Sequence, residues 1–197
     1  MIFDYPELWS ERIHGPMGYA SYESFRPWLR DEFTFRCVYC LKRETWGQVT
    51  GEFELEHFQP QSLAPQLTFD YFNLVYACRR CNLIKLDQQV DDPLTILSSD
   101  FAIVLPDGII ASDRIETKRL IRQLDLNSPK LRKWRVMWMR IADLAAERDS
   151  ILYRQLTGFP DDLPNLSRLR PPSNSSPGSI EISWYAKRQR GQLPDAY

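Results

Sequence analysis

Four cysteines, and one histidine set between them, are the residues of this chain whose types and spacing suit chemistry. The cysteines form two identical pairs, Cys37-Val-Tyr-Cys40 and Cys78-Arg-Arg-Cys81, separated by 37 residues. Each pair presents two thiolates at the spacing that a tetrahedral ion requires, and four thiolates complete a closed structural site. Since a catalytic zinc would need an open position, we expect a structural Zn²⁺ held by all four cysteines.

A disulfide, a redox pair or buried core thiols are the alternatives for the same cysteines. The first residues lack the basic and apolar regions of an export signal, so we expect a cytoplasmic protein. Disulfides are rare in that reducing compartment, which favours zinc.

A group of polar residues surrounds the histidine. Glu54-Leu-Glu56-His57 lies between the cysteine pairs, Asn73 precedes the second pair, and Asn82 directly follows it. One zinc shared by the four cysteines would tie the start of a strand to the start of a helix and bring Glu56, His57 and Asn82 together. A carboxylate, an imidazole and an amide oxygen suit Mg²⁺ or a similar cation beside a general base.

Each of these residues also has an ordinary interpretation when taken alone. His57 would be a structural histidine, and Glu54 is either a solvent-facing strand residue or a second carboxylate near the metal. Asn73 would turn the chain, and Asn82 would cap the helix that follows the second pair. His14 lacks such neighbours, and we expect it to be structural or on the surface.

The segment from 37 to 85 resembles the HNH, or ββα-metal, endonucleases. The shared pattern is C-x-x-C, an acid before His-x-x-Pro, Asn-Leu, and C-x-x-C-Asn-x-x-Lys, which ends here at Lys85. The resemblance implies an α+β fold, with a ββα-metal core stapled by the four-cysteine zinc site and added helices at both ends. It also implies metal-dependent hydrolysis of phosphodiester bonds that leaves 5′-phosphate and 3′-hydroxyl ends.

The resemblance assigns roles to single residues. His57 would be the general base that deprotonates the attacking water, Glu56 and Asn82 would hold the catalytic Mg²⁺ or Mn²⁺, and Asn73 would brace the loop that orients the histidine. Two positions depart from the common pattern, since Glu56 stands where Asp is common and Asn82 where many members have His. Both still offer an oxygen, and the longer Glu56 would shift the metal or admit a water. Lys85, on the same helical face as Asn82, would reach a neighbouring phosphate.

Three further segments are similar to the nuclease component of Septu-type anti-phage systems. They are Asp91-Asp92-Pro93-Leu94, the turn Pro106-Asp-Gly108, and Leu124-Asp-Leu-Asn127. This similarity implies a role in anti-phage or restriction defence and an ATPase as partner.

The distribution of charge points to nucleic acid, although the total does not. Lys and Arg number 25 against 26 Asp and Glu, a net charge of −1, yet residues 114–140 hold nine basic residues against two acids. A solvated helix face is the ordinary explanation, but beside a nuclease motif we expect double-stranded DNA there. The residues expected to contact it are Arg79, Arg80, Lys85, Lys118, Arg119, Arg122, Lys130, Arg132 and Lys133.

Two strands and a helix are expected to position the polar group. Residues 49–57 alternate as a strand, with Glu54 and Glu56 on one face, 72–77 form a second β-rich stretch, and 80–86 have helical character. A short helix over 22–31 would lead to the first cysteine pair, and a hairpin over 101–111 would turn at Asp-Gly.

Longer helices are expected beyond the hairpin, over 114–125 and 129–155. Ser128 and Pro129 form a good N-cap and first-turn pair for the second helix. Its apolar stripe predicts core packing and consists of Leu131, Trp134, Trp138, Ile141 and Ala145.

The two ends of the chain differ in composition. Nine aromatic residues in 1–36, Trp9 among them, alternate with acids and are expected in the core rather than in base stacking. Pro, Gly and Ser make up 12 of the 22 residues in 158–179, which predicts a linker. We divide the chain into an aromatic-rich segment (1–36), a nuclease core (37–112), a basic helical region (113–157), the linker (158–179) and a C-terminal segment (180–197) that docks as an edge strand or forms a basic tail.

No apolar run approaches the roughly 18 residues of a spanning helix, so no membrane partner is expected. The competing function is a zinc-stabilised nucleic-acid-binding or adaptor module that does not cleave by itself and acts with a partner ATPase. Such a module would not need Glu56, His57 and Asn82 together, so their joint presence favours the endonuclease.

Overall fold

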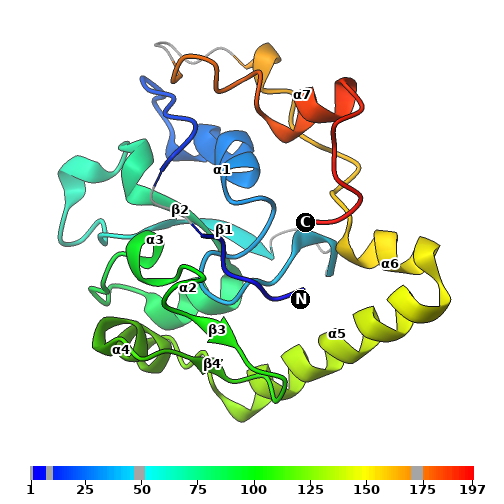
Figure 1. Cartoon of the computed structure of the whole chain (residues 1–197). Coiled ribbons are helices and arrows are strands. Elements are labelled where there is room, and N and C mark those ends of the chain that lie inside the picture. The colour runs from blue at the N-terminus through cyan, green and yellow to red at the C-terminus, as the bar shows by residue number, and fades with distance from the viewer. Residues whose placement is uncertain (1, 8–10, 47–51, 170–174) are drawn as a thin grey trace.

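The computed structural model describes residues 2–7, 11–46, 52–169 and 175–197 (Figure 1). Trp9, residues 49–51 of the expected strand and residues 170–174 of the expected linker lie outside these ranges. The helices are α1 (Arg26–Glu32), α2 (Arg79–Lys85), α3 (Pro93–Ile96), α4 (Ile115–Gln123), α5 (Pro129–Arg148), α6 (Ser150–Thr157) and α7 (Trp184–Gln189). The strands are β1 (Phe53–His57), β2 (Leu74–Cys78), β3 (Ile103–Val104) and β4 (Ile110–Ala111). Helices combined with small two-stranded sheets confirm the α+β class.

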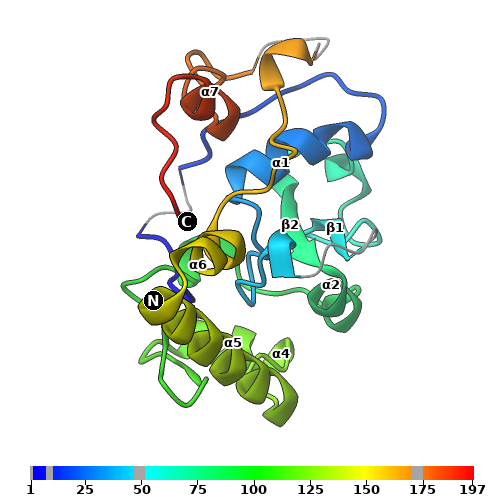
Figure 2. The same cartoon turned by 90° about the vertical axis from the view of Figure 1, so that its right-hand side faces the viewer.

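An antiparallel hairpin of β1 and β2 carries the polar group. The pairing runs from Phe53 opposite Cys78 to His57 opposite Leu74. Helix α1 packs on β2 from one side, and α2 contacts both strands from the other, as Figures 1 and 2 show. Because side chains alternate along a strand, Glu54 and Glu56 face α2, whereas His57 lies on the other face.

The aromatic N-terminal segment belongs to the core, as the sequence predicts. Phe25, Trp28 and Phe35 are completely buried, and so is His14. The Nε2 atom of His14 lies 2.8 Å from a carboxylate oxygen of Asp31, which confirms the structural role expected for this histidine.

The expected hairpin at Asp-Gly is formed by β3 and β4. Gly108 in its turn has φ +81°, and a Cβ there would lie 2.5 Å from the carbonyl oxygen of Arg132. A glycine is required at this position because α5 approaches the turn so closely.

Helix α5 begins at Pro129, as predicted, and Trp134 and Trp138 of its apolar stripe pack on the core, whereas Ile141 lines an outer groove beside Arg140. Trp138 stacks on Trp46 with ring centroids 4.6 Å apart. Arg135 lies on the buried side of the same helix, where its guanidinium donates 2.6 Å hydrogen bonds to the carbonyls of Gly108 and Leu126. Arg135 thus fastens α5 to the second hairpin.

The prediction of one helix through residue 155 is wrong at its end. Asp149 has extended backbone angles between α5 and α6, and its carboxylate accepts hydrogen bonds from the backbone N–H groups of Ile151 and Leu152. The aspartate therefore caps a new helix instead of continuing the old one. None of the helices in the described ranges is long and apolar enough to cross a membrane.

The C-terminal segment is neither an edge strand nor a free tail. It forms the short helix α7, whose first residue, Trp184, donates from its backbone N–H to Asp31 (2.9 Å) and from its indole to the Asp31 carbonyl (3.1 Å). Ser183 caps this helix by accepting from the N–H of Ala186. A serine cap followed by a half-buried tryptophan that bonds Asp31 favours a docked helix over a strand.

Candidate active site and metal centre

The sulfur atoms of the four cysteines gather in one cluster. The ligand atoms of Cys37, Cys40, Cys78 and Cys81 all lie within 4.8 Å of one another, and all four cysteines are free thiols rather than disulfides. Thiolates around a tetrahedral zinc, with Zn–S bonds of about 2.3 Å, stand about 3.8 Å apart. The cluster fits such an ion, as the sequence predicts.

The thiols of this cluster cannot all ionise without a cation. Hydrogen bonds from Cys37, Cys40 and Cys81 lower the pKa of Cys78 well below its ordinary value. The same sulfur neighbours, together with burial, raise the pKa of Cys81, and burial above all raises the pKa of Cys37. A thiolate at Cys78 thus makes it harder for the neighbouring thiols to lose their protons. A bound dication would be needed to stabilise four negative charges.

His57 stands at the last position of β1, where the chain leaves the hairpin. Its Nε2 lies 3.0 Å from the carbonyl oxygen of Thr68 and 3.0 Å from the side-chain amide of Gln61. Because a carbonyl only accepts hydrogen bonds, the Thr68 contact favours a proton on Nε2, with the Gln61 amide turned so that its oxygen faces the ring. Nδ1 then keeps the lone pair that can take a proton. The ring of Tyr22 packs edge-on against the imidazole at 4.9 Å.

Asn73 joins the two ends of the loop between β1 and β2. Its Oδ1 accepts from the backbone N–H of Gln59 at 2.8 Å, and its Nδ2 donates to the carbonyls of Gln59 (3.1 Å) and Leu67 (3.3 Å). The same loop carries Thr68, the partner of the His57 ring. A buried amide with these three bonds fixes the loop on which the imidazole depends.

Glu56 is buried against α2 and the first cysteine pair. Its Oε1 lies 2.6 Å from the ammonium of Lys85, and its Oε2 accepts a 2.6 Å hydrogen bond from the phenol of Tyr39. The Lys85 ammonium also donates to the carbonyl of His57 at 3.0 Å. Both oxygens of Glu56 are therefore engaged by protein donors.

Asn82 meets the other carboxylate of β1. Its amide donates to Glu54, which lies two residues before Glu56 on the same strand face. The structure thus brings Asn82 together with Glu54, and Lys85 together with Glu56, along one side of the hairpin.

Residues 37–88 match the HNH endonuclease family model. The HNH match covers about a quarter of the chain and includes both cysteine pairs, the β1–β2 hairpin and α2. No curated protein matches the chain. The hairpin, the helix and the cysteine cluster together make up the matched segment, which we call the HNH domain.

Lys85 and Arg80, expected at a phosphate, are instead engaged within the protein. The Lys85 side chain is completely buried in the HNH domain. Arg80 donates to the carbonyl of Leu124 at 3.4 Å and contacts the Asp125 carboxylate at 3.1 Å, which ties α2 to the connection before α5. Arg79 stays exposed, with its Nε 3.9 Å from Glu54.

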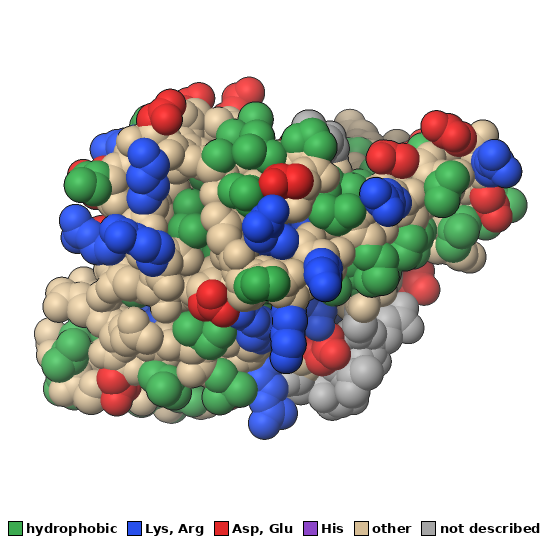
Figure 3. All heavy atoms as spheres, turned by 90° about the horizontal axis from the view of Figure 1, so that it is seen from below, with side chains coloured by type: hydrophobic (Ala, Val, Ile, Leu, Met, Phe, Trp, Pro, Cys, Tyr) green, Lys and Arg blue, Asp and Glu red, His purple; other side chains and the backbone are tan. Residues whose placement is uncertain are grey.

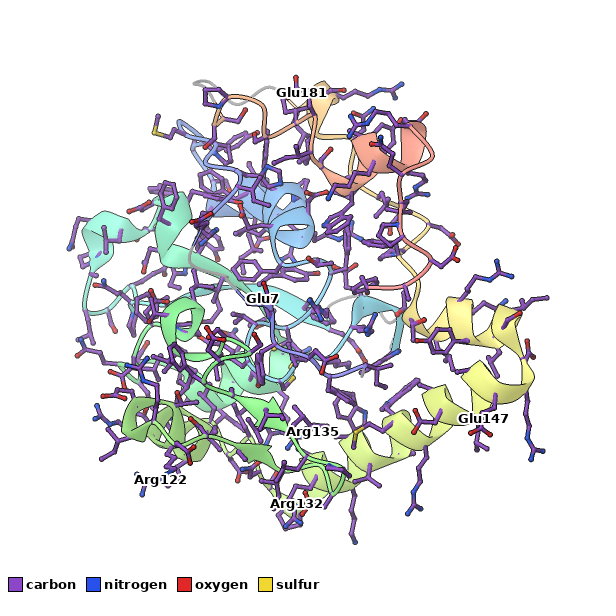
Figure 4. All side chains as sticks on the ribbon, viewed as in Figure 1. Glu7, Arg122, Arg132, Arg135, Glu147 and Glu181 are labelled. Carbon is purple, nitrogen blue, oxygen red and sulfur yellow. The ribbon has the colours of Figure 1, made fainter. Side chains whose placement is uncertain are left out.

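The basic residues of α4 and α5 line the outer side of the molecule seen in Figure 3, where Lys and Arg side chains alternate with apolar ones. Figure 4 shows Arg122 on α4, and Arg132 at the start of α5. Arg119 pairs with Asp91 at 3.3 Å and Arg132 with Asp107 at 3.0 Å. The other residues of these helices that were expected to contact nucleic acid are all exposed: Lys118, Arg122, Lys130 and Lys133.

A groove of about 740 Å³ separates the HNH domain from α5. Lys42, Arg79 and Arg80 line it together with Leu83 and Trp134. Cys40 and Cys78 of the cysteine cluster also line the groove.

Sequence reasoning missed the two tyrosines of the site. Tyr39 lies inside the first C-x-x-C, at a position where the zinc motif allows any residue. Tyr22 lies thirty-five residues before His57. Only the folded chain shows their contacts with Glu56 and His57.

Proposed function

We propose that this chain is a metal-dependent HNH endonuclease that hydrolyses phosphodiester bonds of nucleic acid, with DNA as its substrate. The observation that carries the proposal is the state of His57. When Nε2 donates to the carbonyl of Thr68, 3.0 Å away, the basic Nδ1 is left for a water molecule. An imidazole is the side chain best suited to general-base catalysis near neutral pH.

In the proposed reaction, Nδ1 of His57 takes a proton from water, and the hydroxide attacks phosphorus as the bond to the 3′ oxygen breaks. The departing oxygen is protonated by solvent, which leaves a 5′-phosphate and a 3′-hydroxyl. A bound Mg²⁺ or Mn²⁺ would offset the negative charge that develops on the phosphate and the departing oxygen. Asn82 and a carboxylate of β1 would hold it; the family pattern favours Glu56, whereas Glu54 is the carboxylate that contacts Asn82.

Asn73 contributes indirectly in this proposal. It holds Gln59 and Leu67 at fixed positions, and the carbonyl that orients His57 belongs to the residue after Leu67. A residue that fixes the tautomer of a general base affects the rate without touching the substrate.

The nucleic acid would cross the exposed basic residues of α4 and α5. Lys118, Arg122, Lys130 and Lys133 are exposed, and Arg79 is exposed next to Glu54. Contacts of this kind are with phosphates, so they would set affinity and its salt dependence rather than sequence preference. A role in anti-phage defence with an ATPase partner is proposed from the sequence similarity alone.

Cleavage of plasmid DNA by the zinc-loaded protein, with Mg²⁺ or Mn²⁺ added, tests the proposal. We expect His57→Ala to lose cleavage while zinc content and circular dichroism stay unchanged. Gln66→Ala, at an exposed position of the same loop, is the matched control and should retain most of the activity. Equal cutting by wild type and His57→Ala would refute the base. A wild-type protein that binds DNA but cuts neither DNA nor RNA with any divalent ion, even beside an ATPase partner, would favour the non-cleaving module.

A further inference from the structure

Helix α5 is apolar on two of its faces. The inner face carries Met139, Ala142 and Ala145, which are buried. The outer face carries Met137 and Leu144, which are 47% and 55% exposed. A helix at the surface of a globular domain is usually apolar only on the side that meets the core, so the second apolar face indicates a surface that another molecule covers.

The outer face of α5 is hollowed. Helix α5 lies at the lower edge of the molecule in Figures 1 and 2, and Figure 3 views that edge from below. A groove of about 590 Å³ follows the helix from Pro129 to Leu144, a stretch of about 22 Å at 1.5 Å per residue. Its apolar walls are formed by Val136, Met137, Ile141 and Leu144. The groove therefore has the length and the apolar surface to receive a partner helix of about four turns.

Positive charge surrounds these apolar walls. Arg132, Lys133 and Arg140 line the groove, against the single acid Asp107. Asp107 is already paired with Arg132 at 3.0 Å. Lys133 and Arg140 are exposed, and neither has a carboxylate partner among the residues that the structure describes. The groove thus attracts an occupant that carries negative charge.

An acidic amphipathic helix matches both properties of the groove. Its apolar side would cover Met137 and Leu144, and its carboxylates would meet Lys133 and Arg140. Nucleic acid would offer phosphates to the same cations, but it would leave the methionine and leucine side chains without an apolar partner. A second copy of this chain would bring its own groove cations against these, and like charges oppose such a contact.

We propose that the outer groove of α5 is the docking surface for an acidic amphipathic helix of a partner protein. The inference does not depend on the cleavage reaction, because no residue of the groove belongs to the polar group around His57 or to the cysteine cluster. Of the nucleic-acid contacts proposed above, only Lys133 takes part in it.

Selection of helical peptides on the full, zinc-loaded chain tests the proposal. The probe is a displayed library of four-turn helices with apolar residues at i, i+3, i+4 and i+7, and with either Glu or Lys at the flanking positions. We expect the enriched peptides to carry Glu there. A synthetic copy should bind Met137→Gln/Leu144→Gln about tenfold or more weakly than it binds the wild type. Glutamine removes apolar surface without adding charge, and it is a good helix former.

Ile115→Gln is the matched control, because Ile115 is an exposed apolar residue on α4 that lies outside the groove. It should bind the peptide as the wild type does. Lys133→Gln/Arg140→Gln should weaken binding and remove most of its dependence on salt. Enrichment of Lys-flanked peptides, or of peptides that bind Met137→Gln/Leu144→Gln as tightly as the wild type, would overturn the proposal. A selection that enriches no helix would overturn it as well.

Two further measurements identify the other occupants. Sedimentation equilibrium would show a second copy in the groove if the wild type is a dimer that Met137→Gln/Leu144→Gln dissociates. Fluorescence anisotropy would show nucleic acid there if the same double variant binds DNA more weakly than the Ile115→Gln control while its peptide binding is unchanged. Either result would refute an acidic helix as the occupant.

Discussion

Tyr39 donates a 2.6 Å hydrogen bond to Glu56, and this contact joins the first cysteine pair to the strand that carries His57. Burial, reinforced by the negative charge of Glu56, raises the pKa of Tyr39 well above its ordinary value, so the phenol keeps its proton and stays a donor. The backbone of Tyr39 is held in turn by Tyr5, whose phenol donates to the Tyr39 carbonyl at 2.7 Å. The cysteine cluster thus supports the strand through a defined contact.

Tyr39→Phe should destabilise the fold by about 1–3 kcal/mol, because it leaves one buried oxygen of Glu56 without a donor. Urea unfolding followed by circular dichroism measures the change. Tyr185→Phe on α7 is the matched control and should unfold near the wild-type midpoint. A Tyr39→Phe midpoint equal to that of the control would show that the hydrogen bond contributes nothing to stability.

Cys78→Ser should lose bound zinc and folded structure together, because the binding energy of a structural zinc is part of the folding energy. Zinc per chain by mass spectrometry and the thermal unfolding midpoint are the measurements. Leu83→Ala, at an exposed position of the adjoining helix α2, should retain the ion. A Cys78→Ser protein that is metal-free yet folded would contradict a structural zinc site.

Asn73→Ala should loosen the loop between β1 and β2 more than the rest of the molecule. Three hydrogen bonds to Gln59 and Leu67 are lost, and each contributes about 0.5–1.5 kcal/mol. Hydrogen exchange should become faster across 58–70, and DNA cleavage should fall as His57 loses its fixed partner. Asn165→Ala, which removes the cap of another exposed turn, is the control. Unchanged exchange across 58–70 would exclude the bracing role.

The local elements of the site could be predicted from the sequence, but the pairing of its side chains could not. Alternation correctly placed Glu54 and Glu56 on one strand face, and the cysteine spacing correctly brought α2 against the hairpin. Neither pattern determines how α2 is aligned along β1. This alignment decides that Asn82 contacts Glu54 and that Lys85 contacts Glu56. It depends on packing between elements distant in sequence.

The same limit explains two errors elsewhere in the chain. Helical periodicity continues past Asp149, so only the capping of Ile151 and Leu152 by its carboxylate reveals the break. The β-branched residues near 180 favour a strand locally, but Trp184 finds its partner in Asp31, far away in the sequence. Tertiary contacts outweigh local preference at both places.

Arg135→Ala should destabilise the protein by about 3 kcal/mol or more, because the buried carbonyls of Gly108 and Leu126 each lose a charged donor. Burial lowers the pKa of Arg135, because removing a charged guanidinium from water is unfavourable. The charge is therefore stabilised in the core by its hydrogen bonds to these carbonyls. Arg140→Ala, on the exposed side of the same helix, should change stability by about 0.5 kcal/mol or less. Equal urea midpoints for the two variants would refute a structural role for Arg135.

Asp31→Ala should release α7 from the core while leaving the HNH domain folded. The carboxylate accepts from the backbone of Trp184 at 2.9 Å and lies 2.8 Å from the buried His14, so its removal takes this partner from both nitrogens. Limited proteolysis should cut within 175–197 faster in the variant than in the wild type, with zinc content unchanged. Asp162→Ala removes a carboxylate that is 74% exposed and pairs with Arg30, and it should be cut at the wild-type rate. Equal proteolysis of Asp31→Ala and Asp162→Ala would show that other contacts hold α7 in place.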